Sequence, residues 1–297
     1  MKRIPGLVLL CAFVFAALSS VAAQEMQGAG TMPPPKVLVL FREFLKPGKG
    51  GEPHEKAESA FVQAFTKSKW PTHYLAVGSL SGRPRALFLT GYDSFADWEK
   101  DNKAVEKNSM LSAALDRASV ADGELLSDAD GSVMVYREDQ SLRANVDIAH
   151  MRYFEISLYQ VRPGHRRDWD EAVKLVKAAY EKIPDAHWAT YQLVYSQQPG
   201  STYVIFTALK SASEIDDSFM RDKDFVAAMG EDGMKKLAEL EDKAIESVQN
   251  NLFMFNPKMS YVSEEWIKAD PDFWKPRVTT TAAPKKPEKA AEKPAGQ

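Results

Sequence analysis

The alternation of apolar and polar residues is clearest in the second half of the chain. Between Arg152 and Val161, large apolar side chains alternate with more polar ones, and this period of two residues predicts a β-strand. The pair Pro163 and Gly164 follows directly and ends the strand. One face of this strand is distinctly more apolar than the other, so we expect it to form part of a half-buried sheet.

A helix, two strands, a second helix and a last strand are predicted after this break. The first helix carries an apolar stripe with helical spacing, formed by Trp169, Ala172, Val173, Val176 and Tyr180. Aromatic and β-branched residues predict strands over 190–195 and 203–209, joined by a short turn. Ser211 and Glu214 have the spacing of a capping box, which predicts the start of the second helix. The last strand is expected around 252–255.

The same order of elements occurs earlier in the chain at a nearly constant offset. Pro47 and Pro163 are 116 residues apart, Leu89 and Phe206 are 117 apart, and Met134 and Phe253 are 119 apart. Ser94 stands at the start of the second helix of the first half, as Ser211 does in the second half. We therefore predict an internal duplication, with the small drift in offset placed in loops.

Each half follows the order β-α-β-β-α-β of ferredoxin-like modules. The predicted fold is α+β, with one module over 34–140 and a second over 148–262. Such a four-stranded sheet has helices on one face only, so its other face needs a cover. We expect the two tandem modules to pack sheet to sheet as an intrachain pseudo-dimeric α/β barrel.

The repeated strand-Pro-Gly-helix opening, the capped second helix and the closing aromatic strand resemble the dimeric α/β-barrel superfamily. That superfamily includes NIPSNAP-like and antibiotic-biosynthesis-monooxygenase-like domains. The resemblance covers about Lys36 to Val262. It implies a central cavity lined by the sheet faces that point away from the helices.

The two ends of the chain differ from the modules in composition. Residues 1–23 have a basic start, an apolar run and a small-residue end, which predicts a secretory signal peptide and a periplasmic or secreted protein. The alternative is an uncleaved membrane anchor. The only cysteine, Cys11, lies in this segment, so the mature chain has no thiol chemistry. The composition of residues 279–297 predicts a disordered tail or a flexible tether. Residues 263–278 are expected to form a segment that packs back onto the barrel.

The more polar face of the strand over 152–161 was expected to line the cavity, which makes Tyr153, Glu155 and Tyr159 candidate ligand-binding residues. Glu43 is the corresponding candidate in the first half. A carboxylate in such a cavity could act as a base, because desolvation raises its pKa. The alternative for Glu155 is an ion pair with a cross-strand Arg or Lys.

Histidines are dispersed along the chain and form no recognised metal motif. His73 and the neighbouring residues His187 and Trp188 stand at the entrance of a strand in each half, where a flat ligand could bind. His54 and His165 are expected at or just before helix starts, in contact with solvent or with the helix start. No histidine shows His-x-x-x-His or His-x-Glu spacing, so no metal site is predicted, and no catalytic residue or cofactor is predicted either.

The sequence favours an exported protein that binds a small, partly apolar ligand in the barrel cavity. A first alternative is a cofactor-independent monooxygenase-like enzyme acting on a phenolic or quinol substrate, with Glu155 or His73 as the base. A second alternative is a haem-binding protein. Net charge is only −3 with no basic stripe, so nucleic acid is not an expected partner, and no membrane span is expected after signal cleavage. Pairing into a homo-oligomer is left open.

Overall fold

The computed structural model describes residues 30–197 and 200–275. The predicted signal peptide and the predicted tail over 279–297 therefore lie outside the described residues. No helix within the described ranges is both long and apolar enough to cross a membrane.

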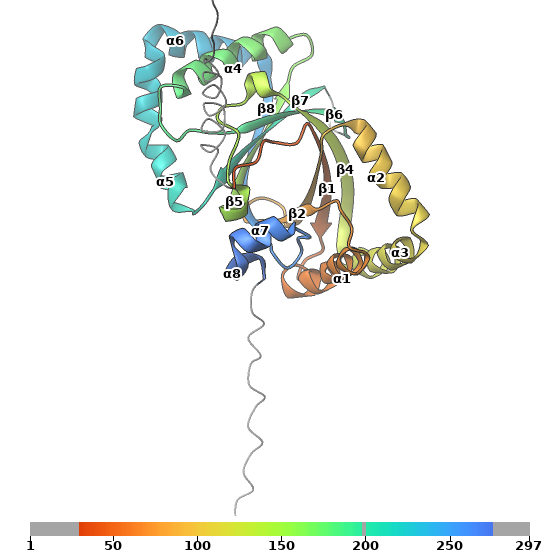
Figure 1. The fold of residues 1–297 in the computed structure, drawn as a ribbon. Coiled ribbons are helices and arrows are strands. Elements are labelled where there is room, and N and C mark those ends of the chain that lie inside the picture. Colours follow the sequence, from red (N-terminus) through yellow and green to blue (C-terminus); the bar gives the residue numbers. More distant parts are fainter. Residues whose placement is uncertain (1–29, 198–199, 276–297) are drawn as a thin grey trace, which may run out of the picture.

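Eight antiparallel strands form one closed barrel in the order β1-β3-β2-β8-β5-β7-β6-β4 (Figure 1). The strands are β1 (Val37–Leu45), β2 (Tyr74–Ser79), β3 (Arg85–Tyr92), β4 (Leu126–Tyr136), β5 (Tyr153–Val161), β6 (Ala189–Tyr195), β7 (Ser201–Leu209) and β8 (Ile245–Phe255). Closure satisfies the backbone groups that an open sheet edge would leave unpaired.

Within each half the strands follow the same spatial order. The first half reads β4-β1-β3-β2 and the second reads β8-β5-β7-β6. The halves join edge to edge where β2 pairs with β8 and β4 pairs with β6. Their inner faces then face each other across one lumen, which gives each sheet the cover that it would lack alone.

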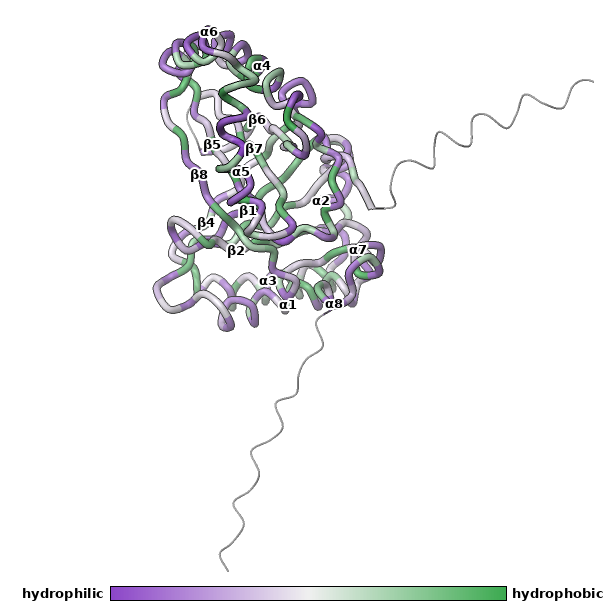
Figure 2. Tube along the Cα trace, turned by 90° about the vertical axis from the view of Figure 1, so that its left-hand side faces the viewer, coloured by the Kyte–Doolittle hydropathy of each residue, from purple (hydrophilic) through white to green (hydrophobic). Residues whose placement is uncertain are grey.

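The helices lie outside the barrel. They are α1 (Glu52–Ser68), α2 (Phe95–Lys107), α3 (Ser109–Gly123), α4 (Arg166–Tyr180), α5 (Ser213–Met220), α6 (Asp222–Ala244), α7 (Glu264–Ala269) and α8 (Pro271–Trp274). Figure 1 shows α1–α3 on one side of the barrel and α4–α6 on the other. In Figure 2 hydrophilic colour is concentrated on outer helices such as α6, and hydrophobic colour runs along the strands. The barrel wall is therefore covered on two opposite sides.

The repeated Pro-Gly turns have a backbone reason. Gly48 adopts φ +74° and Gly164 adopts φ +86°, both in the left-handed region that side chains with a Cβ avoid. Each glycine stands just after the first strand of its half, where the chain turns toward the first helix. The same constraint at two places 116 residues apart explains why this dipeptide is the clearest repeated signal in the sequence.

The second helix of each half begins differently from its counterpart. Ser94 caps α2 as predicted, because its hydroxyl accepts from the backbone N–H of Asp97 at 3.1 Å. The capping box predicted at Ser211 is wrong: α5 begins at Ser213, and no side chain caps it. The Ser211 hydroxyl instead contacts the Ser213 hydroxyl at 2.7 Å.

The main hydrophobic core fills the lumen and extends to the C-terminal segment. Its strand residues include Leu38, Leu40, Leu75, Val77, Leu87, Leu89, Met134, Phe154, Ile156, Tyr191, Val204, Phe206, Phe253 and Phe255. Trp274 of α8 belongs to the same core, and Trp266 and Phe273 pack against it. Smaller clusters lie between α1 and α3 and between α4 and α6. Most of the lumen is thus a packed core.

Candidate functional site

A cavity of about 580 Å³ lies at the end of the barrel where β1, β2, β5 and β6 begin. This volume falls within the range of about 300–1,000 Å³ typical of small-molecule sites. Its floor is formed by lumen-facing residues, among them Leu38, Leu75, Leu89, Phe154 and Phe206. Because these side chains belong to the barrel core, the cavity has a rigid apolar base.

A proline-rich segment and the C-terminal segment cover this cavity. Residues 32–35 form one wall, and Val262, Ser263 and Trp266 form part of another. The Tyr191 hydroxyl, also at the cavity, donates to the Pro35 carbonyl oxygen at 3.1 Å and holds the proline segment in place. Segments far apart in the sequence therefore meet over the barrel mouth.

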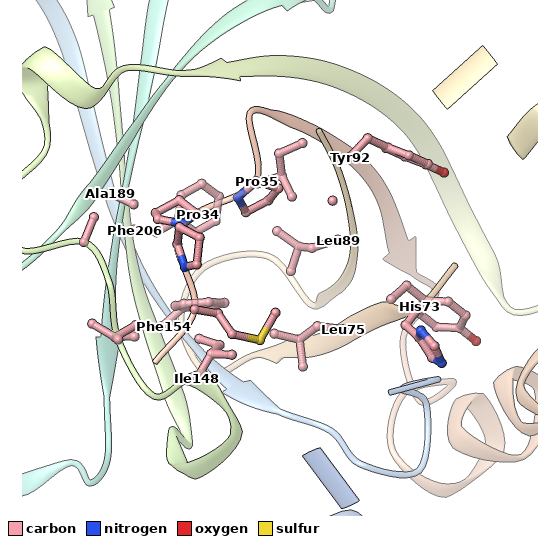
Figure 3. A pocket seen from close by; sticks show the side chains of 18 of the residues that line it. Pro34, Pro35, His73, Leu75, Leu89, Tyr92, Ile148, Phe154, Ala189 and Phe206 are labelled. Carbon is pink, nitrogen blue, oxygen red and sulfur yellow. The ribbon is translucent and has the colours of Figure 1, made fainter. Parts of the chain in front are cut away.

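Two polar side chains of the cavity, His73 and Tyr92, lie on the same side of it. Figure 3 shows His73 and Tyr92 at one side, with Phe154, Ile148 and Ala189 at the other. Tyr92 donates its hydroxyl to Asp101 at 2.9 Å, and burial raises the pKa of this phenol. The site is therefore mostly apolar, with orienting groups at one side.

His73 is the titratable group best placed to meet a ligand. Its ring stacks on Tyr261 with centroids 4.8 Å apart, which fixes its orientation. Burial lowers the pKa of His73, and a backbone hydrogen bond with Pro71 only partly opposes this effect. The imidazole is consequently neutral at pH 7. Because proline has no N–H, the bond with Pro71 uses the imidazole N–H as its donor, and the other ring nitrogen is left to accept a hydrogen bond.

His187 and Trp188 also line the cavity, but their polar atoms are already engaged. The two ring nitrogens of His187 lie 2.9 Å from the Asp185 carbonyl oxygen and 2.8 Å from that of Ala208. The Trp188 indole N–H donates to the Gln140 carbonyl oxygen at 2.8 Å. These two residues can offer a ligand ring surface more readily than a hydrogen bond.

The expected orientation of the first strand in each half is wrong. Phe154, Ile156 and Leu158 belong to the lumen core, so the opposite face of β5, with Tyr153, Glu155 and Tyr159, points toward the helices. Tyr159 packs against Trp169 of α4 with ring centroids 5.1 Å apart, and burial raises the pKa of its phenol. The more apolar face turns inward because the lumen is a core rather than a polar channel.

Glu43 is also turned away from the cavity, and it meets three further titratable side chains. The four residues are Glu43 of β1, His54 and Glu58 of α1, and Asp122 of α3, and their candidate ligand atoms all lie within 4.8 Å of one another. His54 Nε2 lies 2.9 Å from Glu43 Oε2 and 3.5 Å from Asp122 Oδ1. We refer to these four residues as the carboxylate–histidine cluster.

Burial dominates the electrostatics of this cluster. It raises the pKa of Glu58 to about 9, with further increases from the negative charges of Glu43 and Asp122. Burial and the charge of Glu43 raise the pKa of Asp122 to about 6, although His54 partly opposes the shift. Without a bound ion, Glu58 therefore keeps its proton at neutral pH, whereas Asp122 has mostly lost its proton.

Glu58 and Asp122 were not predicted from the sequence. Of the two expectations for His54, contact with solvent is wrong, since only 2% of it is exposed, whereas its place in the first turn of α1 is as expected. One pattern could have found part of the cluster. His54 and Glu58 are four residues apart, which places both side chains on one face of α1. Asp122 has no comparable sequence pattern, because only the packing of α3 on α1 brings it near.

Comparisons with known proteins give similarity to solved structures only. No protein-family model matches the chain, and no curated protein matches it. A candidate monooxygenase from Fusobacterium nucleatum is similar with a TM-score of 0.48 and 11% identity, covering 75% of this chain and 94% of that one. An anthrone oxidase-like protein gives a TM-score of 0.46 at 12% identity, with 74% and 92% covered.

A variant of chlorite dismutase from Candidatus Nitrospira defluvii is also similar, with a TM-score of 0.42 and 9% identity over 79% of this chain and 95% of that one. None of these proteins is similar enough in sequence to assign its activity to this chain.

Proposed function

We propose that the barrel cavity binds a small, flat, largely apolar molecule with a polar group at one edge. The observation that carries this proposal is the cavity of about 580 Å³, whose floor is the apolar barrel core and which has His73 and Tyr92 at one side. An apolar ring system would replace water against Phe154 and Phe206, and burial of apolar surface favours binding by about 25 cal/mol per Å².

His73 would orient the polar group of such a ligand. It is half-buried, held against Tyr261, and neutral because burial lowers its pKa. Its N–H is directed to the Pro71 carbonyl, so the other ring nitrogen can accept a hydrogen bond, which suits a phenolic hydroxyl. Trp188 and Tyr92 would flank the ligand with aromatic surface.

The binding test uses the uncharged fluorescent probe N-phenyl-1-naphthylamine. We expect its fluorescence to rise on titration with the purified protein and to fall when Ala189→Trp fills the cavity. The matched control is Val194→Trp on the same strand, because Val194 is 41% exposed and lies outside the cavity. Equal binding by both variants, or none by the unmodified protein, contradicts the proposal. Native mass spectrometry of the same sample would reveal a co-purifying molecule.

A second candidate function is oxidation of a phenolic substrate by O₂ without a cofactor, and the position of His73 favours it. The neutral imidazole would take the phenolic proton, and O₂ would oxidise the ring carbon opposite the hydroxyl. One oxygen atom would become the new carbonyl and the other would leave as water. Loss of O₂ consumption in His73→Gln, with activity kept in Glu155→Gln, is the expected result. Equal activity of the two variants, or none in the unmodified protein, counts against this candidate.

Of these candidate functions, haem binding has the least support from the residues that line the cavity. An axial ligand needs a free imidazole nitrogen, and both nitrogens of His187 lie against carbonyl oxygens. His73 is the other histidine that lines the cavity. Titration with haemin, followed by the Soret band in unmodified protein and His73→Gln, separates specific ligation from non-specific uptake.

We further propose that the barrel arose by tandem duplication of one ferredoxin-like module, with copies over 34–140 and 148–262, and that it belongs to the dimeric α/β-barrel superfamily. The common strand order of the two halves and the repeated Pro-Gly turns support this origin.

Export is also a proposal, and it rests on the composition of residues 1–23. Cell fractionation followed by N-terminal sequencing should find the mature chain outside the cytoplasm, beginning at Gln24. Size-exclusion chromatography of that material would report whether the barrel pairs further.

A further inference from the structure

The carboxylate–histidine cluster has the residue types and spacing of a metal site. Its four members come from β1, α1 and α3, which enclose them on the outer side of the barrel wall. We propose that Glu43, His54, Glu58 and Asp122 bind one divalent transition-metal ion that is recognised by imidazole and carboxylate ligands, of the class of Zn²⁺, Mn²⁺ and Fe²⁺.

The cluster is almost completely withdrawn from solvent, and two of its carboxyl oxygens lack a hydrogen-bond partner among the residues that the structure describes. Glu43 is 4% exposed, His54 2%, Glu58 3% and Asp122 2%. Within the described part of the chain, Glu58 Oε1 and Asp122 Oδ1 have no hydrogen-bond partner, although both are buried. Buried polar atoms are nearly always paired, so two orphan carboxylate oxygens in one cluster point to a missing ligand.

Charge gives the same indication. The cluster contains three carboxyl groups and one imidazole, and the ion pairs described for Glu43 and Asp122 are both with His54. The nearby Lys258 is paired with Glu55 on the surface of α1 and is not part of the cluster. Burial of the carboxyl groups without a cation favours their protonated, neutral forms. A divalent cation would instead offset most of the negative charge of the carboxylates.

The ligand atoms are close enough for one ion to reach all four. Metal–ligand bonds to imidazole nitrogen and carboxylate oxygen are about 2.0–2.2 Å long, so ligand atoms lie about 3.4 Å apart in a tetrahedral site and about 4.2 Å apart when trans in an octahedral one. The observed spread of up to 4.8 Å therefore requires the side chains to close around the ion. Three oxygens and one nitrogen without sulfur suit Zn²⁺, Mn²⁺ or Fe²⁺ better than Cu⁺, which prefers thiolates, or Ca²⁺, which takes six to eight oxygens.

The second half of the barrel shows that the fold does not require these polar residues. Glu43 is the seventh residue of β1, and the seventh residue of β5 is Tyr159. Tyr159 packs on Trp169 of α4, within an apolar cluster that includes Val161, Tyr203 and Ala244. The same place between strand and helices is thus filled by aromatic packing in one half and by titratable groups in the other.

A bound ion would join β1, α1 and α3 and would stand apart from the cavity. Because carboxylate and imidazole ligands bind a metal ion in their deprotonated forms, binding should release protons to solution. The role that follows is structural, a metal cross-link of the first half of the barrel.

The test begins with purified protein that has been treated with chelator and then given Zn²⁺, Mn²⁺ or, without oxygen, Fe²⁺. We expect one tightly held equivalent of at least one ion, measured by elemental mass spectrometry after desalting. At a hundredfold excess over Kd, the ion should raise Tm by at least about 5 °C. Co²⁺ in the same site should give an intense visible absorption without a thiolate charge-transfer band.

Two conservative variants and one control make this test specific. Glu58→Gln and His54→Gln should each weaken binding by at least about tenfold. Without metal, the Tm of the Glu58→Gln variant should be no lower than that of the unmodified protein, because the neutral amide replaces a buried carboxyl group. Glu55→Gln changes the neighbouring surface carboxylate and should bind normally. No retained metal, a Co²⁺ spectrum like that of the free ion, or equal binding by all variants would overturn the proposal.

Discussion

His54 Nε2 lies 2.9 Å from Glu43 Oε2, and this buried contact joins the end of β1 to the first turn of α1. It also shows which way β1 faces, because Glu43 can meet α1 only if Leu38 and Leu40 point into the lumen. The contact therefore couples the position of a helix to the register of the barrel wall.

Loss of the His54 donor should destabilise the metal-free protein. His54→Ala leaves the buried Glu43 carboxyl without its partner, and breaking such a buried pair typically costs about 3–5 kcal/mol. His54→Gln keeps an N–H donor and should cost less than half as much. Urea unfolding in the presence of chelator measures both values. Equal losses in the two variants would mean that packing volume, and not the hydrogen bond, sets the cost.

The stability of the metal-free protein should fall as pH rises from about 5 to 9. The pKa of Glu58 is raised to about 9 in the folded chain, whereas the unfolded chain releases this proton near the ordinary carboxyl value of 4.5. Between these values the folded state binds more protons than the unfolded state, so the free energy of unfolding decreases with pH. For one proton the slope approaches about 1.4 kcal/mol per pH unit.

Asp122 adds to this decline only at the acidic end, because its folded pKa is about 6. Tm measured in chelator at several pH values checks the prediction. Glu58→Gln should flatten the profile above pH 6, while the surface variant Glu55→Gln should retain it. A flat profile in the unmodified protein would show that Glu58 is not held in its protonated form.

The repeated pattern predicted the order of strands and helices well, because it depends on local rules. The Pro-Gly turns need glycine in the left-handed region, and the Ser94 cap needs only its own helix. The alternation with a period of two residues predicted a strand from Arg152, and β5 begins one residue later, at Tyr153. Each of these features depends on only a few neighbouring residues in the sequence.

Local rules of this kind could not predict which face of β5 points into the lumen. Glu155 and Tyr159 made one face more polar, and a polar face normally points away from a core. The error was to treat the lumen as a wet cavity, when Phe154 and Ile156 fill it as a core. Only the number of strands that close the barrel, and hence the width of its interior, decides this question.

The members of the carboxylate–histidine cluster are separated by up to 79 residues in sequence, from Glu43 to Asp122. No spacing rule links a residue near the end of α3 with a residue near the end of β1. Their meeting depends on how α3 packs on α1, which is tertiary information. The cavity residues His73 and Trp188 were found from sequence because each stands at a strand entrance, and the barrel gathers its strand ends at the rim.

Gly91→Ala should loosen the cover of the cavity. A Cβ at this position would lie 2.7 Å from both Cβ and Cγ of Pro35, so the proline segment would have to move. Overpacking of this kind costs about 1–3 kcal/mol. The matched control is Gly78→Ala on β2, where an added Cβ meets nothing within 4 Å. Binding of N-phenyl-1-naphthylamine should change in the first variant and not in the second, and the reverse order would contradict the assigned cover.

The C-terminal helices should contribute to the stability of the barrel itself. Trp274 is 5% exposed, packs in the lumen core, and donates its indole N–H to the Ala149 carbonyl oxygen at 2.9 Å. Trp274→Ala removes both the packing and the hydrogen bond and should cost about 3–5 kcal/mol. Trp274→Phe keeps most of the ring and should cost about 1 kcal/mol through the lost hydrogen bond, plus a smaller packing loss. Unfolding by urea, followed by far-ultraviolet circular dichroism, reports the whole barrel rather than the short helices. If Trp274→Ala unfolds at the midpoint of the unmodified protein, residues 264–274 lie on the barrel without stabilising it.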